Sequence, residues 1–188
     1  MSRSFVIAIV SVVALGIGVT SATASHLQTN ETGCNATNAN DVFSGGQGSD
    51  TCNLLNGNDR YQGREGDDTL IESNGNSGND EMIGGKNQDQ VYGGADDDSI
   101  RGGDGDDTVG GFGDDGDDTL LGNGGNDNVL DINDGPDDED NLQGNGGNDA
   151  IDGDDGDNED VIDGGEGTDD CEADSTEPVV NCETITRT

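Results

Sequence analysis

Aspartate recurs thirteen times at a nearly fixed spacing between residues 45 and 172, and this series is the chain's strongest candidate for chemistry. Each of these aspartates holds the sixth place of a nine-residue frame, G-G-x-G-x-D-x-U-x, where U is a large apolar residue, as in GGDGDDTVG at residues 102–110. Carboxylates are hard oxygen ligands, and Ca²⁺ takes about six to eight oxygens. The frame therefore predicts thirteen calcium ligands: Asp50, Asp59, Asp68, Asp80, Asp89, Asp98, Asp107, Asp118, Asp127, Asp140, Asp149, Asp160 and Asp169.

The other fixed positions of the frame describe the backbone that must hold those carboxylates. Glycine at positions 1, 2 and 4 permits positive φ and a tight turn whose carbonyls can point at one ion. Position 8, two residues after the aspartate, points inward from a short strand and builds the core. With four short insertions allowed, the expected core residues are Cys52, Tyr61, Leu70, Met82, Val91, Ile100, Val109, Leu120, Val129, Leu142, Ile151, Ile162 and Cys171.

This frame resembles the nonapeptide of the RTX (repeats-in-toxin) calcium-binding proteins. The resemblance covers residues 45–172 and implies an all-β fold, a parallel β-roll (β-helix solenoid) of about thirteen units, in which two units form one coil of 18 residues. It also implies multiple bound Ca²⁺ ions, each between two turns stacked on the same side. Seven odd and six even turns leave gaps for up to about eleven such ions. The alternative, favoured when calcium is absent, is a disordered acidic, glycine-rich tract.

The segments outside the repeats are assigned from their composition. Residues 1–24 have the basic, apolar and A-x-A parts of a secretory signal peptide, with cleavage after Ala24. The rival interpretation is a membrane anchor, but the apolar run is too short to span a bilayer. Residues 25–44 are predicted to form a polar leader and N-terminal cap, residues 45–172 the repeat region and residues 173–188 a C-terminal cap. The expected location is secreted, extracellular or at the cell surface, with no membrane span after signal cleavage.

Four cysteines behind a secretory leader suggest disulfide bonds. With the coil spacing that the RTX resemblance implies, Cys52 and Cys171 lie six coils apart, which is about 29 Å. That separation is far beyond the ~7 Å limit between the Cα atoms of a disulfide. The expected pairs are therefore Cys34–Cys52 and Cys171–Cys182, one at each end of the roll. The alternative is free thiols buried at core positions.

Composition argues against nucleic-acid binding and against catalysis. The chain has 43 acidic and 6 basic residues, a net charge of −37, so it should stay expanded unless cations bind. The basic residues are scattered, so they form no footprint for nucleic acid. His26 is the single histidine, so the chain has no Ser-His-Asp, Cys-His or HExxH set, and we expect it not to be an enzyme.

The four insertions (Glu72 to Asn74, Gly111-Phe112, Asp131 to Asp134 and Gly153-Asp154) all precede even-numbered units, which places them on one side of the implied roll. In solenoids insertions map to loops on one face, often the binding face, although drift on a loosely packed side would give the same pattern.

Two functions agree with this sequence. The first is a secreted calcium-binding repeat protein whose folding is driven by Ca²⁺, with a structural or surface-interaction role. The alternative is a calcium-dependent adhesin or accessory module that recognises a specific extracellular or cell-surface partner or glycan.

Overall fold

The structure is a computed structural model that describes residues 24–25, 33–34, 36–72, 76–111, 116–131, 138–154, 156 and 159–188. The predicted signal peptide therefore lies outside the described residues, apart from Ala24. Within the described part of the chain, no helix is long and apolar enough to cross a membrane.

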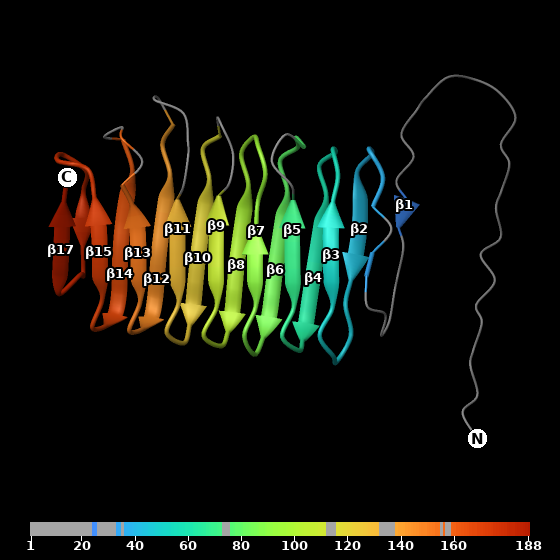
Figure 1. Ribbon diagram of the computed structural model, residues 1–188, viewed down its shortest axis with the longest axis horizontal. Coiled ribbons are helices and arrows are strands. Elements are labelled where there is room, and N and C mark those ends of the chain that lie inside the picture. The colour runs from blue at the N-terminus through green and yellow to red at the C-terminus, as the bar shows by residue number, and fades with distance from the viewer. Residues whose placement is uncertain are drawn as a thin grey trace, which may run out of the picture.

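Two parallel β-sheets build the molecule, and the chain passes from one to the other after almost every strand (Figure 1). The nine-stranded sheet consists, in spatial order, of β1 (Ala24–Ser25), β2 (Asp41–Ser44), β4 (Arg60–Glu65), β6 (Glu81–Lys86), β8 (Ser99–Asp104), β10 (Thr119–Gly124), β12 (Asn141–Gly147), β14 (Val161–Gly167) and β16 (Val179–Val180). The eight-stranded sheet consists of β3 (Thr51–Leu54), β5 (Thr69–Glu72), β7 (Gln90–Tyr92), β9 (Thr108–Gly111), β11 (Asn128–Asp131), β13 (Ala150–Gly153), β15 (Asp170–Ala173) and β17 (Thr184–Arg187).

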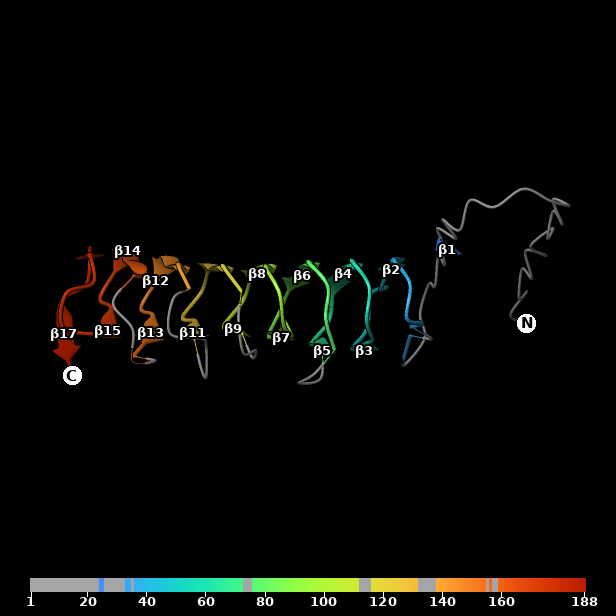
Figure 2. The same ribbon diagram turned by 90° about the horizontal axis from the view of Figure 1, so that it is seen from above.

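The two sheets lie face to face as separate layers, as Figure 2 shows. Strands that are neighbours within a sheet come from successive coils: Leu70 of β5, for example, pairs with Cys52 of β3 and Val91 of β7. This is the β-roll that the repeat frame predicts, and the prediction of an all-β parallel solenoid is confirmed.

The core is a ladder of apolar side chains between the sheets. Residues of the strands alternate between inward and outward positions, because successive side chains point to opposite faces of a sheet. All thirteen predicted core residues are buried, from Cys52 in β3 to Cys171 in β15. At the N-terminal end Phe43 continues the ladder and lies with its ring centroid 6.2 Å from that of Tyr61.

The boundaries of the four insertions differ from those expected. The repeat frame assigns four residues to insertions that are each buried at the last position of a strand in the structure: Glu72, Gly111, Asp131 and Gly153. Glu72 pairs in register with Leu54, and Asp131 with Gly111. Strand alternation is the reason: the residue two places after the core position points inward again, so the extra residues begin one place later.

Both ends of the roll are closed by disulfide bonds. Cys34 is bonded to Cys52 with Cα atoms 4.9 Å apart, and Cys171 to Cys182 with Cα atoms 6.2 Å apart. The predicted pairing is confirmed. At the C-terminal end the Arg187 guanidinium also donates hydrogen bonds to the backbone carbonyls of two residues in the preceding turn, at 2.7 and 3.1 Å.

Candidate metal centre

The thirteen predicted ligands form two columns, one along each edge of the roll. Aspartates of odd units, such as Asp107, end the turns that lead into the eight-stranded sheet, whereas those of even units, such as Asp98, end the turns that lead into the nine-stranded sheet. Every one of the thirteen is buried. A carboxylate removed from water is costly unless it is hydrogen-bonded or paired with a cation, so the columns need compensation.

One carboxylate oxygen of every predicted ligand except Asp50, which begins the odd column, accepts a hydrogen bond from the neighbouring coil. The Oδ1 atom of Asp107 accepts a hydrogen bond from the backbone N–H of Asp89 at 2.8 Å, and the N–H of Asp107 donates to Asp127 Oδ1 at 2.8 Å. The carbonyl of Asp107 accepts the N–H of Asn128 at 2.9 Å. The same bond from aspartate N–H to Oδ1 runs along the odd column from Asp50 to Asp169 and along the even column from Asp41 to Asp160.

The second carboxylate oxygen has no such donor in most of these aspartates. Among the described residues, Oδ2 is buried without a hydrogen-bond partner in Asp59, Asp68, Asp80, Asp89, Asp107, Asp127, Asp149 and Asp169. Leaving a buried charged acceptor unsatisfied costs more than about 1–3 kcal/mol each. Six of these eight atoms lie in the odd column and two in the even column, and their burial indicates that they require a positive partner.

Backbone oxygens converge on the same points. A Cβ placed on Gly63 would lie 2.1 Å from Asp68 Oδ2 and 2.3 Å from the carbonyl oxygen of Gly84 in the next coil. Gly144 has the same surroundings, with Asp149 Oδ2 at 2.3 Å and the Gly164 carbonyl oxygen at 2.6 Å. The absence of a side chain at position 1 thus lets a carboxylate oxygen and a carbonyl oxygen meet. A donor set made only of oxygens fits Ca²⁺.

The conformation of position 2 distinguishes two kinds of turn. Asn123 and Asn145 hold this position with φ of 81° and 72°, a left-handed conformation that asparagine tolerates, and the Oδ2 atoms of the aspartates ending those turns have no donor. In the turns ending at Asp50 and Asp98, the position-2 glycine is not left-handed, and its N–H donates to Oδ2 at 2.8 and 2.9 Å. Asp50 and Asp98 are therefore partly satisfied by the protein itself.

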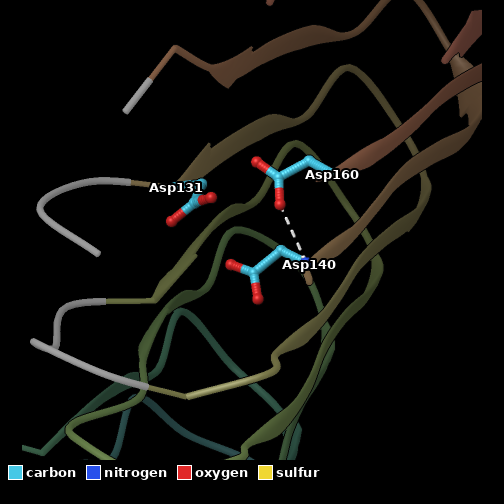
Figure 3. Close-up of side chains that lie close together, drawn as sticks. All are labelled: Asp131, Asp140 and Asp160. Carbon is cyan, nitrogen blue, oxygen red and sulfur yellow. Dashed lines mark hydrogen bonds between the residues drawn. The ribbon is translucent and has the colours of Figure 1, made fainter. Parts of the chain in front are cut away.

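Carboxylates outside the frame also reach the columns. Asp131, at the end of β11, lies with Asp140 and Asp160 so that one oxygen of each is within 4.8 Å of the others (Figure 3). Glu72 occupies the matching place at the end of β5, and Glu183 Oε2 accepts the N–H of Asp169 at 2.9 Å, which extends the odd column by one step. Sequence reasoning missed these three residues. For Glu72 and Asp131, counting two places on from the core position would have found them.

The comparison with protein families decides the class of this repeat. The model of the RTX calcium-binding nonapeptide repeat matches the chain in four copies, at residues 35–61, 55–71, 74–109 and 112–130. The chain is an RTX-type calcium-binding repeat protein. RTX repeats bind multiple Ca²⁺ ions. A comparison with curated proteins found no match, and neither did one with solved structures.

The RTX repeats extend beyond the matched segments in the structure. Strands β12 to β15 follow residue 130, and they keep the parallel register of the earlier coils, with Leu142 opposite Leu120 and Ile151 opposite Val129. Asp149 and Asp169 keep the aspartate ladder as well. The same repeat geometry therefore runs from β3 to β15.

Burial makes the aspartates of the RTX roll weak acids when no cation is present. It raises the pKa of Asp59, Asp89, Asp98 and Asp127 from 3.8 to about 7, and the pKa of Asp68 and Asp107 to about 6. The backbone N–H from the preceding coil opposes the increase, whereas neighbouring carboxylates add to it. A cation bound at these oxygens would therefore compete with protons.

These pKa values predict a reversed pH dependence for the calcium-free roll. A carboxyl group whose folded pKa lies above its unfolded value stabilises the fold fully below about pH 4 and loses that contribution as the pH rises through about 6 to 7. In chelator, β-structure should therefore increase as the pH is lowered from about 7 to about 4. Circular dichroism across this range measures the change. A β signal that decreases on acidification in chelator would contradict this assignment.

Substituting the glycines of one RTX turn tests the packing around the carboxylate. In Gly122→Ala, the new Cβ would lie 2.4 Å from Asp127 Oδ2, whereas in Gly124→Ala the nearest atom of another turn lies 3.7 Å away. Neither glycine has positive φ, so the difference is steric. We expect Gly122→Ala to cost about 1–3 kcal/mol of stability, as overpacking does, and Gly124→Ala to cost much less. Calcium midpoints of folding for both variants are the measurement, and equal midpoints would contradict the proposed packing.

Proposed function

We propose that this chain is a secreted protein and that calcium binding to its position-6 aspartates drives its folding. The folded roll then has a structural or surface-interaction role. The observation that carries the proposal is the set of eight buried aspartates whose Oδ2 atoms have no donor within the described residues, most of them in the odd column. In the odd column each of these atoms lies beside a glycine, and at Gly63, Gly84, Gly102 and Gly144 the carbonyl oxygen of the next coil is there too. Bound Ca²⁺ would supply the positive charge that these oxygens require.

Charge supports the coupling of calcium binding to folding. The net charge of −37 and the small apolar content leave the metal-free chain with strong repulsion and little core to oppose it. Two ion pairs, Arg60–Glu81 and Lys86–Glu65, are found among the described residues, and both are exposed. Exposed ion pairs contribute about 0–1 kcal/mol, so they do not offset the buried aspartates. The free energy of calcium binding then becomes free energy of folding.

Secretion is supported by the leader-like composition of residues 1–24 and by the two disulfide bonds. Disulfides persist in oxidising compartments and are rare in the cytosol. The test is to express the full chain with a C-terminal tag in its producing cell and to sequence the N-terminus of the tagged protein found in the medium. Mature protein that begins near Ser25 is the expected result. Retention of an uncleaved chain inside the cell would contradict secretion.

The second candidate function is that of a calcium-dependent adhesin, and the sidedness of the insertions favours it. All four insertions fall in connections that run from the eight-stranded to the nine-stranded sheet: β5–β6, β9–β10, β11–β12 and β13–β14. Connections of the other direction keep the nine-residue frame without interruption. One edge of the roll therefore carries all of the irregular sequence.

Removing the extra residues separates the two functions. The variant lacks residues 73–75, 112–113, 132–135 and 154–155, which restores the uninterrupted frame while keeping every strand residue. Its calcium-dependent circular dichroism should match that of the full chain. If the insertions form the binding face of an adhesin, the trimmed protein no longer retains calcium-dependent binding to the surface of the producing cell. Equal binding by the trimmed protein and the full chain would show that the insertions do not form the binding face.

A further inference from the structure

Glu72 is a buried carboxylate that the repeat frame does not account for. It is the last residue of β5, its side chain is 1% exposed, and neither carboxylate oxygen has a hydrogen-bond donor among the described residues. Leu54 holds the same register position in the preceding coil. A leucine there fills the core, so an acid at this place carries a cost that packing alone does not explain.

The Glu72 carboxylate points into the even column of aspartates. A Cβ on Gly94, in the next coil, would lie 2.8 Å from the Glu72 carboxyl carbon and 3.0 Å from its Oε2 atom. Gly94 donates its N–H to Asp98 Oδ2, so Glu72 lies directly beside the turn that Asp98 ends. Asp80, which ends the turn following Glu72, is its strongest charged neighbour, and Asp80 Oδ2 also has no donor.

The arrangement is repeated at a second insertion. Asp131 ends β11, is 2% exposed, and pairs in register with Gly111, as Glu72 pairs with Leu54. Its carboxylate lies within 4.8 Å of oxygens from Asp140, which ends its own turn, and Asp160, which ends the next even turn. Glu72 holds the corresponding position relative to Asp80, which ends its own turn, and Asp98, which ends the next even turn, and both carboxylates act on its charge. Both acids occur where an insertion interrupts the glycine-rich start of the even turn.

We propose that Glu72 and Asp131 are additional calcium ligands, each completing a site on the even side of the roll together with the aspartate that ends its own turn. This inference rests on the proposed calcium-driven folding and extends it beyond the position-6 aspartates. In these two coils an insertion breaks the glycine pattern of the turn that would otherwise bring oxygens to the ion. The carboxylate at the end of the preceding strand supplies hard, charged oxygens instead. A calcium ion between two carboxylates removes the repulsion that otherwise opposes their burial.

The alternative is that Glu72 is a neutral carboxylic acid in the folded protein. Without a cation, burial raises the pKa of Glu72 far above its ordinary value, and Asp80 contributes to the increase, because a protonated Glu72 donates a hydrogen bond to the Asp80 carboxylate and avoids the repulsion of its charge. Glutamine has nearly the same shape as a protonated glutamate. The two alternatives therefore predict opposite results for Glu72→Gln.

The experiment measures the number of calcium ions bound per chain by equilibrium dialysis and the calcium midpoint of folding by circular dichroism. The variants are Glu72→Gln and Asp131→Asn, with Glu172→Gln and Asp152→Asn as controls that remove the same charge from outward positions of the same sheet. We expect each test variant to bind one ion fewer and to fold at a higher calcium concentration by a factor of at least about two. The controls should leave both quantities unchanged.

Glu72→Gly keeps the test decisive if Glu72→Gln does not fold, because Gly111 holds this register position in β9. A folded Glu72→Gly protein that binds one ion fewer supports the proposal. Unchanged stoichiometry and midpoint in both Glu72 variants would overturn it and would establish the neutral acid. If the unaltered chain itself folds equally well in chelator, calcium-driven folding fails, which is a separate outcome from the failure of Glu72 as a ligand.

Discussion

Chelation of calcium is expected to unfold the roll, and this is the largest effect that we predict. In excess chelator at neutral pH, the mature chain should lose its β spectrum and expand. Millimolar calcium should restore the β spectrum, since extracellular calcium modules commonly bind with Kd values of about 10⁻⁴ to 10⁻³ M. The buried Oδ2 atoms without donors explain why: each keeps its negative charge out of water with no partner from the protein.

The matched control for this experiment is magnesium at the same concentration. Mg²⁺ has the same charge as Ca²⁺ but prefers a smaller octahedral site and releases its water reluctantly. Recovery with calcium alone would therefore identify specific sites and exclude simple screening of the net charge. Far-UV circular dichroism and the hydrodynamic radius are the two measurements. An identical β spectrum in chelator and in calcium would refute calcium-driven folding.

Loss of a central aspartate is expected to have the second largest effect. Asp107 lies in the middle of the odd column, and its Oδ1 atom accepts the N–H of Asp89 while its Oδ2 atom has no donor. Asp107→Ala removes both oxygens and leaves the Asp89 N–H without its acceptor, a cost of about 1–3 kcal/mol before any lost calcium is counted. Because each repeat contacts only its neighbours, the damage divides the stack into two shorter pieces.

Asp169 provides the matched terminal variant. It has the same ladder bond, from the N–H of Asp149 at 2.8 Å, but only the C-terminal cap lies beyond it. Asp169→Ala should therefore fray one end and raise the calcium midpoint less than Asp107→Ala does. Asp107→Asn keeps an acceptor for Asp89 and removes the charge alone, so it isolates the contribution of the ligand. Equal midpoint shifts for Asp107→Ala and Asp169→Ala would argue against a nearest-neighbour solenoid.

The sequence alone determined the fold and the positions of most candidate ligands. The frame repeats locally, and each unit carries its own turn glycines, its aspartate and its inward apolar residue, so one unit predicts the next. For that reason the strand order, the buried ladder that includes Leu70 and Ile100, and the two disulfide pairs all agree with the predictions. The signal peptide, the caps and the ligand roles of the aspartates stay predictions.

The tertiary structure alone decided how the carboxylates are satisfied. The partner of each ladder bond lies 18 to 22 residues away, as for Asp50 with Asp68 and Asp127 with Asp149, so stacking and not local sequence assigns Oδ1 to the protein. It likewise showed that Glu72 and Asp131 face inward, because the sheet register continues through residues that the frame counts as inserted. Local periodicity can specify a coil, but only the packing of one coil on the next determines which oxygens remain available to a cation.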